Sequence, residues 1–429
     1  MSKNCDKTIF LDKPKNTFWS LSDGEITLFQ KKVKICEKTN VSIESSIAAE
    51  IDILNAADAY NVYKLYIDDK EVTNSGYEAV SQPQVGSQNL ETSSLTWVGT
   101  ECCCFVVKLT AQIFRTRIPP PPPRPPPPPP PIISSNIIEN EGNFDLAKGA
   151  FLRINLLSTC SAVYFFKNIE ADWSDNNPAI LFKETIWLDP YSQVYISSSI
   201  ATEILGVNPN NIYELYINGE KVVNTQYSGN NNAYHLETAT LIWSGSANSC
   251  TKIKIKLVAT TFPGSANVNI SEGNFRDAKG AFMSVIVNKC EDALTKFKDK
   301  PKNVFWEGNE TVLYKKTFNV KETIMVNGTI SAITPNPDYN IYRLYINDKQ
   351  VCQSGFKSFG QFPSPSPSLG IYFETSSLVW SGCIKDLYDC QKCNNPRIKV
   401  KITAQTKNGQ QSRVDQAFGG AFLSIYSYD

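Results

Sequence analysis

Three copies of one ordered set of motifs run through this chain of 429 residues. The motif Tyr-x-Leu-Tyr-Ile-Asp/Asn begins at Tyr63, Tyr213 and Tyr342. In each copy it is followed by Glu-Thr-x-x-Leu-x-Trp and then by Gly-Ala-Phe, which begin at Glu91 and Gly149, at Glu237 and Gly280, and at Glu374 and Gly420. The copies lie roughly 130–150 residues apart, which is the size of a self-sufficient domain rather than of a solenoid repeat. The repetition therefore predicts one fold built three times.

Each copy has the pattern of β-strands. Along residues 213–218, Tyr213, Leu215 and Ile217 share one face of an extended chain, because strand side chains alternate. Asn218 and Gly219 then have the residue types of a tight hairpin turn. Similar patterns mark about seven or eight short strands in each copy, and helical periodicity is hard to find. The sequence predicts an all-β chain of three tandem antiparallel β-sandwich domains. Jelly-roll topology is favoured over an immunoglobulin-like one, whose Cys…Trp…Cys spacing is missing.

The repeat also places the domain boundaries. We expect units at residues 1–160, 161–290 and 291–429, with joints only a few residues long at Cys160 and Cys290. Such short joints predict a stiff row of three domains rather than three freely tumbling ones.

A run of prolines from Pro119 to Pro131, broken only by Arg124, resembles an interdomain linker. Comparison with the second copy instead assigns it to an insertion at about residues 115–135, between the last two strands of the first domain. As a polyproline II helix, the run would extend about 40 Å. It is either a ligand for an aromatic groove of the SH3, WW or EVH1 type or a surface loop without a partner, and the loop is the commoner case.

The chain has 12 cysteines, which is many for a cytosolic enzyme. Most of them follow the tryptophan of a repeat or close a unit, so we expect them at the ends of the sandwiches. Disulfides, some of them between subunits, are the favoured interpretation. A zinc site at Cys383, Cys390 and Cys393 is the alternative, but a fourth ligand is missing, and Cys36 and Cys352 fit buried thiols. The candidate cross-linking cysteines are Cys5, Cys102, Cys103, Cys104, Cys160, Cys250, Cys290, Cys383, Cys390 and Cys393.

Catalytic patterns are not found in the sequence. His235 is the single histidine, and no nearby nucleophile or orienting acid completes a triad. We interpret it as an ordinary loop or strand-edge residue. Glu91, Glu237 and Glu374 recur once per copy just before a strand, which indicates a turn or strand contact rather than a glycosidase pair. We therefore predict a protein that is not an enzyme and uses no cofactor or metal.

Charge and hydropathy exclude two further classes of function. The 42 basic and 42 acidic side chains balance, so the basic surface of a nucleic-acid-binding protein is not expected. No apolar run approaches the roughly 20 residues of a membrane span. The first residues are polar, unlike a secretory signal.

The cysteine-bearing N-terminal extension, with Cys5, and the cysteines on sandwich-end loops resemble a known arrangement. It is similar to that of the cysteine-linked jelly-roll subunits of bacterial endospore appendages and related spore-surface proteins. The resemblance implies assembly through disulfides to neighbouring subunits, and synthesis inside the mother cell without a signal peptide. This chain differs by its three domains, its single N-terminal cysteine and its proline run.

These observations favour a structural or assembly protein on the surface of a spore, virion or cell, made without a recognisable signal peptide. Its expected partners are copies of itself or related surface proteins. The alternative is a multivalent carbohydrate-binding or adhesive, lectin-like protein, in which Tyr66, Tyr216 and Tyr345 would be stacking platforms for a glycan. A partner that binds proline motifs is a further expectation for the proline run.

Overall fold

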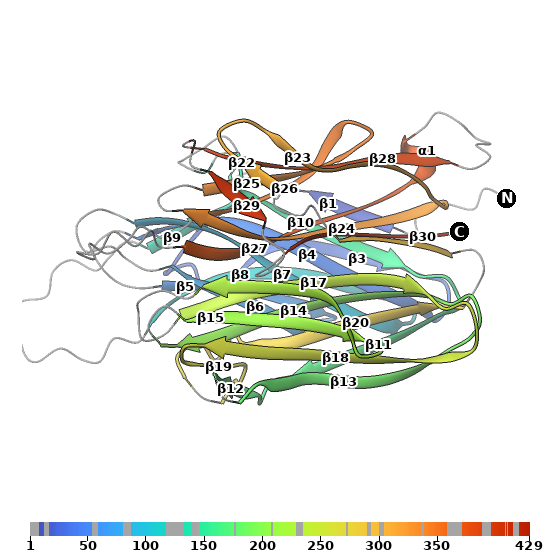
Figure 1. Ribbon diagram of the computed structural model, residues 1–429, viewed down its shortest axis with the longest axis horizontal. Helices are drawn as coiled ribbons and strands as arrows, with labels where there is room; N and C mark the ends of the chain where they lie inside the picture. Colours follow the sequence, from blue (N-terminus) through green and yellow to red (C-terminus); the bar gives the residue numbers. More distant parts are fainter. Residues whose placement is uncertain are drawn as a thin grey trace, which may run out of the picture.

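The computed structural model describes residues 8–429 apart from several segments. These are residues 13–16, 54–58, 80–86, 117–132, 139–143, 145, 176, 207–208, 229–234, 272, 290–292, 300–303, 336–338, 358–370, 388–395, 408, 410 and 415–419. Almost all of the described chain is strand, and the strands run along the long axis of the molecule (Figure 1). The predicted all-β class is confirmed.

The strands form three β-sandwiches that follow one another in the sequence. Sandwich 1 contains β1 (Thr8–Asp12), β2 (Phe18–Ser20), β3 (Ile26–Lys34), β4 (Thr39–Ile53), β5 (Ala59–Ile67), β6 (Lys70–Ala79), β7 (Ser87–Glu101), β8 (Cys104–Arg115), β9 (Ile133–Asn136) and β10 (Gly149–Leu156). Sandwich 2 contains β11 (Ser161–Asn168), β12 (Asp172–Ser174), β13 (Ala179–Leu188), β14 (Gln193–Leu205), β15 (Asn210–Ile217), β16 (Glu220–Ser228), β17 (His235–Ser246), β18 (Thr251–Phe262), β19 (Ser265–Asn267) and β20 (Gly280–Asn288). Sandwich 3 contains β21 (Ala293–Asp299), β22 (Val304–Trp306), β23 (Thr311–Asn319), β24 (Thr323–Pro335), β25 (Tyr339–Ile346), β26 (Lys349–Lys357), β27 (Ile371–Cys383), α1 (Ile384–Leu387), β28 (Arg397–Thr406), β29 (Ser412–Val414) and β30 (Ala421–Tyr428).

The strand order is that of a jelly roll in all three sandwiches. In sandwich 1 the larger sheet has the order β1-β10-β4-β9-β2, with β7 paired to β4, and the smaller sheet has the order β3-β8-β5-β6. Sandwiches 2 and 3 repeat this order strand for strand. Apart from the hairpins β5-β6, β15-β16 and β25-β26, neighbours in each sheet are not consecutive in the sequence, as two Greek keys require, and the favoured topology is confirmed.

The expectation of seven or eight short strands per unit is wrong. Each described unit has ten, and β4 and β7 are 15 residues long. The extra strands include β2 and β9, which are too short to show a period of two in the sequence.

Local sequence explains the hairpins and the buried faces. Tyr213, Leu215 and Ile217 alternate with more exposed neighbours along β15, as predicted. Asn218 and Gly219 turn the chain into β16 with φ angles of 53° and 89°. Positive φ at both positions matches the twist of the flanking strands, and asparagine and glycine adopt it at low cost.

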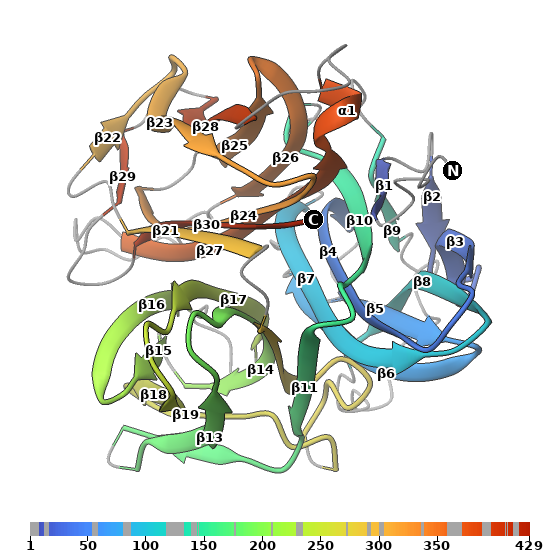
Figure 2. The same cartoon turned by 90° about the vertical axis from the view of Figure 1, so that its right-hand side faces the viewer.

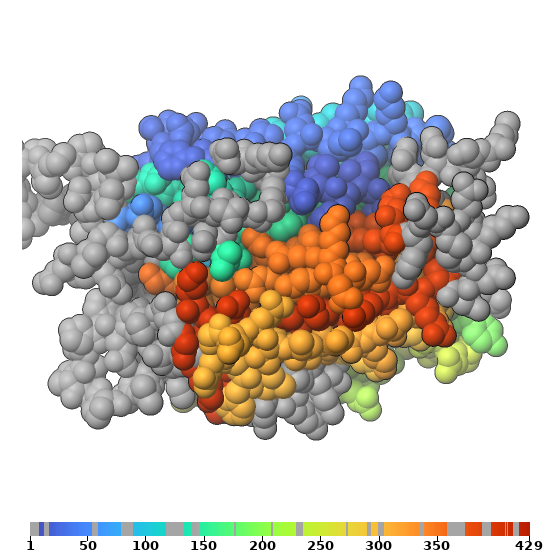
Figure 3. All heavy atoms as spheres, turned by 90° about the horizontal axis from the view of Figure 1, so that it is seen from above, coloured from blue at the N-terminus to red at the C-terminus, as the bar shows by residue number. Residues whose placement is uncertain are grey.

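The three sandwiches close around a common axis instead of forming the predicted row. Figure 2, which looks along the strands, shows them arranged as the three parts of a trimer. Strand β6 packs on β17, β16 packs on β27, and β26 packs on β7, so each sandwich contacts both others. Figure 3 shows the surface atoms of sandwich 3, in orange to red, directly beside the blue atoms of sandwich 1. We call these contacts seams 1–2, 2–3 and 3–1. The prediction of a row was wrong, because short joints between the units are equally compatible with side-by-side packing of the sandwiches.

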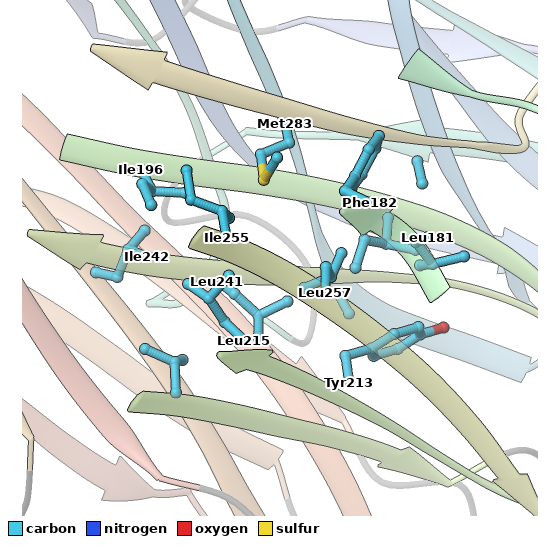
Figure 4. Close-up of a cluster of buried hydrophobic side chains, with 14 of the residues drawn as sticks. Leu181, Phe182, Ile196, Tyr213, Leu215, Leu241, Ile242, Ile255, Leu257 and Met283 are labelled. Atoms are coloured by element: carbon cyan, nitrogen blue, oxygen red, sulfur yellow. The ribbon is translucent and has the colours of Figure 1, made fainter. Parts of the chain in front are cut away.

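Each sandwich has its own hydrophobic core between its two sheets. In sandwich 2, Leu215, Leu241, Ile255 and Met283 meet there (Figure 4). The cores are not fully separate, because Phe422 of sandwich 3 belongs to the core cluster of sandwich 2. Likewise, Phe151 of sandwich 1 belongs to that of sandwich 3.

Candidate functional site

The interior around the common axis is polar and nearly solid. Strands β7, β17 and β27 contact one another there. The cavity between them has a volume of about 10 Å³, which is room for no more than a single water molecule. It is lined mainly by hydroxyl and amide side chains, including Ser45, Ser94, Thr96, Ser197, Ser198, Ser199, Thr240, Asn327, Thr329 and Ser377. The axis is therefore a contact region between the three sandwiches.

Hydroxyl groups repeat the same contact at the three seams. Thr238 Oγ1 donates to the carbonyl of Gly76 at 2.7 Å across seam 1–2, and Thr92 Oγ1 donates to the carbonyl of Gly355 at 2.8 Å across seam 3–1. At seam 2–3, Thr375 Oγ1 lies 3.4 Å from the carbonyl of Gln226, to which it donates, and its hydroxyl also bonds to that of Thr225 at 2.6 Å. Thr92, Thr238 and Thr375, which occupy equivalent positions in the three repeats, thus each hydrogen-bond across a seam.

One buried ion pair connects all three sandwiches. Arg153 Nη2 donates to Glu44 Oε2 at 2.6 Å within sandwich 1, and to the Tyr195 hydroxyl of sandwich 2 at 3.0 Å. Tyr195 donates to Glu44 Oε1 at 2.9 Å, and Asn327 of sandwich 3 donates to Glu44 as well. Both charged side chains are fully buried. Burial alone would lower the pKa of Arg153, but the Glu44 carboxylate and Tyr195 outweigh it and raise that pKa.

Sequence reasoning missed this network. A signal was present, because Arg153 interrupts an otherwise apolar strand at the position where the other copies have Ser284 and Ser424. A charge inside a buried strand predicts a buried partner.

The repeated glutamates lie in strands, not before them. Glu91, Glu237 and Glu374 are buried within β7, β17 and β27, so of the two contacts expected for them the strand contact is confirmed and the turn contact is wrong. Glu91 accepts a hydrogen bond from Tyr227 of sandwich 2 at 3.0 Å. Burial is the main cause that raises the pKa of Glu91 well above its usual value, and it raises the pKa of Glu237 to about 8.

His235 is the first residue of β17, which agrees with the expected strand-edge position, but its side chain is buried. Its Nε2 lies 3.0 Å from the Tyr227 hydroxyl, and its Nδ1 lies 3.7 Å from Glu78 Oε2 of sandwich 1. Burial lowers the pKa of His235 to about 3, so the imidazole is neutral near pH 7.

The cysteines divide into exposed, bonded and buried groups. Cys102, Cys103, Cys104 and Cys250 are exposed at the end of the molecule where β7 and β17 end. Cys160 is in a disulfide bond. Cys383 is buried, which makes it a poor cross-linking residue. Cys5, Cys290, Cys390 and Cys393 lie outside the described residues.

The two cysteines expected to be buried thiols behave differently. Cys352 is buried as predicted, and burial raises its pKa to about 12. Cys36 is exposed, so that expectation is wrong. It lies beside the other thiols of sandwich 1, because the Ile35 amide donates to the Cys103 carbonyl at 3.0 Å. Among the described residues, no group of three histidine, cysteine or acidic side chains could hold a metal ion.

The three tyrosines proposed as glycan platforms share one environment. A lysine ammonium lies over the rings of Tyr66, Tyr216 and Tyr345 at 4.6, 4.5 and 3.7 Å from their centres. Each lysine is the direct cross-strand neighbour of its tyrosine. The lysine covers one face of each ring, so that face is not open for stacking on a sugar.

Two other surface features bear on ligand binding. Pro119, Arg124 and Pro131 lie outside the described residues, between β8 and β9, so the insertion precedes a short strand that sequence reasoning did not foresee. An open groove of about 520 Å³ runs between β11 and β13 over Phe165, Phe166 and Leu181. No helix among the described residues is long and apolar enough to cross a membrane.

Comparisons with known proteins place this fold only loosely. No protein-family model and no curated protein matches the sequence. PNGF-II is 6% identical, with 87% of this chain and 98% of that chain covered at a TM-score of 0.25. A protein described by the triple jelly roll fold and turret assembly in an archaeal virus is 7% identical, with 98% and 91% covered at 0.17. VP2 in the subviral particle of infectious bursal disease virus is 8% identical, with 93% and 81% covered at 0.20. These TM-scores are low, so the jelly-roll assignment depends on the strand pairing described above, and the resemblance to spore-appendage subunits stays a prediction.

Proposed function

We propose that this chain is a structural protein whose three sandwiches form one trimer-like block, and that copies of the block associate on the surface of a particle such as a spore, a virion or a cell. The observation that supports this most is the cyclic closure of three jelly rolls within a single chain. Closure repeats the same outer strand arrangement three times around one axis. A contact that fits one side of the block therefore recurs on the others, as in symmetric assemblies.

The outer edges of the block have features of a contact surface. Strands β3, β13 and β23 pair on one side only. Two equivalent residues beside a bulge, Ile180 and Val312, are 51% and 46% exposed on these edges, and Trp187 is 67% exposed. Lysines such as Lys31 on β3 and Lys315 on β23 lie on the same edge strands, and charge on an edge strand opposes uncontrolled sheet extension. These edge strands thus favour contacts between blocks through side chains rather than through extension of the sheets.

The exposed thiols provide a route to covalent links between blocks. Cys36, Cys102, Cys103 and Cys104 are all exposed at one corner of sandwich 1. A thiolate of one block attacks a small-molecule disulfide and releases one thiolate of that molecule. A thiol of a second block then displaces the remaining half, so one small disulfide becomes two thiols and the blocks share a new disulfide.

The test is the mass and appearance of the full-length chain with and without reductant. We expect light scattering and electron microscopy to show assemblies at high protein concentration, and non-reducing gels to show covalent dimers. A variant with serine at Cys36, Cys102, Cys103, Cys104 and Cys250 should form markedly fewer covalent dimers. The Cys352→Ser control should keep them, because Cys352 is buried. A single-chain mass under every oxidising and reducing condition, at all concentrations, would refute the proposal.

A further inference from the structure

Sandwich 1 buries a lysine between a glutamate and an asparagine. Lys148 Nζ donates to Glu50 Oε2 at 2.7 Å and to Asn136 Oδ1 at 2.6 Å. The two charged side chains are at most 3% exposed. Asn136 lies opposite Glu50 where β9 pairs with β4, and Lys148 directly precedes β10. We call these three residues triad 1.

Sandwich 2 contains the same arrangement, which we call triad 2. Lys279 Nζ donates to Glu203 Oε2 and to Asn267 Oδ1, at 2.6 Å in both cases. Asn267 likewise lies opposite Glu203, where β19 pairs with β14. The backbone holds the carboxylate in place, because the Asn274 amide donates to its Oε1 at 3.1 Å. A Cβ atom at Gly273 would overlap the carboxylate, so glycine leaves it the room that it needs.

Sandwich 3 replaces all three members of the triad. Ile333 and Arg413 are the opposed pair of β24 and β29, in the places of the glutamate and the asparagine. Gly419 precedes the Gly-Ala-Phe motif in the place of the lysine. A buried ion pair needs only the lysine and the glutamate, yet the asparagine changes with them. The joint replacement indicates that the three residues act as one unit.

The contacts of the triads suit a reaction between the lysine and the asparagine. A lysine amine that is neutral and removed from water is a nucleophile. Transfer of a proton from Nζ to the glutamate produces that amine and replaces two buried charges by two neutral groups. Nζ already contacts the oxygen that is bonded to the asparagine Cγ, so the two reacting groups are held together in advance. In triad 1 the Ile138 amide donates to Asn136 Oδ1 at 3.3 Å, where it would stabilise negative charge on that oxygen.

We infer that the triads form isopeptide cross-links, from Lys148 to Asn136 and from Lys279 to Asn267. The glutamate takes a proton from the lysine ammonium, and the neutral Nζ attacks Cγ of the asparagine to form a C–N bond. The glutamate passes this proton to Nδ2 as the Cγ–Nδ2 bond breaks and ammonia leaves. It then takes the second proton that Nζ loses and gives it to the ammonia, which departs as ammonium. The reaction uses no oxidant and no other reactant.

Each cross-link would join a short strand to the start of the strand that follows it. Strands β9 and β19 have only four and three residues, so few backbone hydrogen bonds hold them. A covalent link restricts the unfolded chain, as a disulfide does, but reductants do not break it. In sandwich 1 it would also fix a residue at seam 3–1, because the Lys148 carbonyl accepts a hydrogen bond from Gln353 of sandwich 3 at 2.6 Å.

The test is the intact mass of the full chain after denaturation and reduction. We expect it to be lower than the mass of the sequence by one ammonia for each bond, about 17 Da, and therefore by two in all. Digestion with trypsin should leave the bonds after Lys148 and Lys279 uncut. Peptide mapping should then find two branched peptides, one with Asn136 joined to Lys148 and one with Asn267 joined to Lys279.

Substitutions separate the roles of the triad residues. Lys279→Met should restore one ammonia to the mass. Glu203→Gln keeps both reacting side chains, but it should also lose the cross-link of triad 2, while triad 1 in the same chain serves as the internal reference. Lys357→Met, at a half-buried lysine of sandwich 3, is the matched control and should keep both cross-links.

Closure of an asparagine onto its own backbone also releases ammonia, but this loss would persist in Lys279→Met and would give no branched peptide. The full mass of the sequence, or a loss of ammonia without branched peptides, would overturn the inference. The measurement on the unmodified chain needs no variant to fold. Neither outcome bears on whether blocks associate.

Discussion

Gly76 illustrates how single residues set the distance between sandwiches. Its carbonyl accepts a hydrogen bond from Thr238 across seam 1–2. A Cβ atom at this position would lie 2.3 Å from the carbonyl oxygen of Asn61 and 2.9 Å from Cβ of Ala278, which belongs to sandwich 2. Only glycine permits this approach.

We predict that Gly76→Ala lowers the free energy of unfolding by roughly 1–3 kcal/mol, because the added methyl forces the two strands apart. Denaturant unfolding measures the loss. Gly308→Ala is the control, since its new Cβ would meet no atom closer than 3.7 Å. Equal stability of the two variants would mean that the seam tolerates the methyl and that the close approach is not essential.

Residues whose structure is local could be predicted from the sequence, and residues at the seams could not. The hairpin at Asn218 was foreseen, because turn geometry depends on adjacent residues alone. The burial of Glu91 and His235 was not, because it depends on which strands of different sandwiches meet. In the sequence these polar side chains were interpreted as signs of turns or loops. In the structure they are buried, because strands of different sandwiches pack on one another there.

At the scale of elements, strand β10 carries Arg153, one half of the buried ion pair that joins the three sandwiches. Arg153 and Glu44 are buried as an ion pair, while the equivalent residues of sandwich 2 are Ser284 and Ser197. The fold therefore contains its own uncharged version of the pair. An ion pair that is removed as a whole leaves no unpaired charge behind.

We predict that Arg153→Ser costs roughly 3–5 kcal/mol of unfolding free energy, because Glu44 is left charged and buried. The double variant Glu44→Ser with Arg153→Ser, which copies sandwich 2, should cost at least about 1 kcal/mol less than that single variant. Both are measured by chemical unfolding. If the double variant is as unstable as the single one or worse, the pair is not replaceable in this way.

Strand positions followed from the sequence where alternation is long. The alternation of Tyr213, Leu215 and Ile217 along β15 was foreseen for that reason. Strands β2 and β9, of three and four residues, were not, because they give no periodic signal and are held by pairing with a distant strand.

At the scale of the whole molecule, the sequence predicted three similar units but not their closure. The seams are rich in buried serine and threonine, such as Ser94, Thr240 and Ser377. In a sequence these residues have the composition of a solvent-facing surface. An interface held by hydroxyl groups and backbone therefore has no hydrophobic signature, and only the structure shows that the chain closes on itself.

Small-angle X-ray scattering of the full chain at low concentration in reductant tests this closure most directly. A closed block of 429 residues should have a radius of gyration of about 22 Å and a single symmetric distance distribution. A radius of gyration of about 30 Å or more, with a long tail in the distances, is what three such domains in a row would give. That second result would contradict the trimer-like block and the proposals that depend on it.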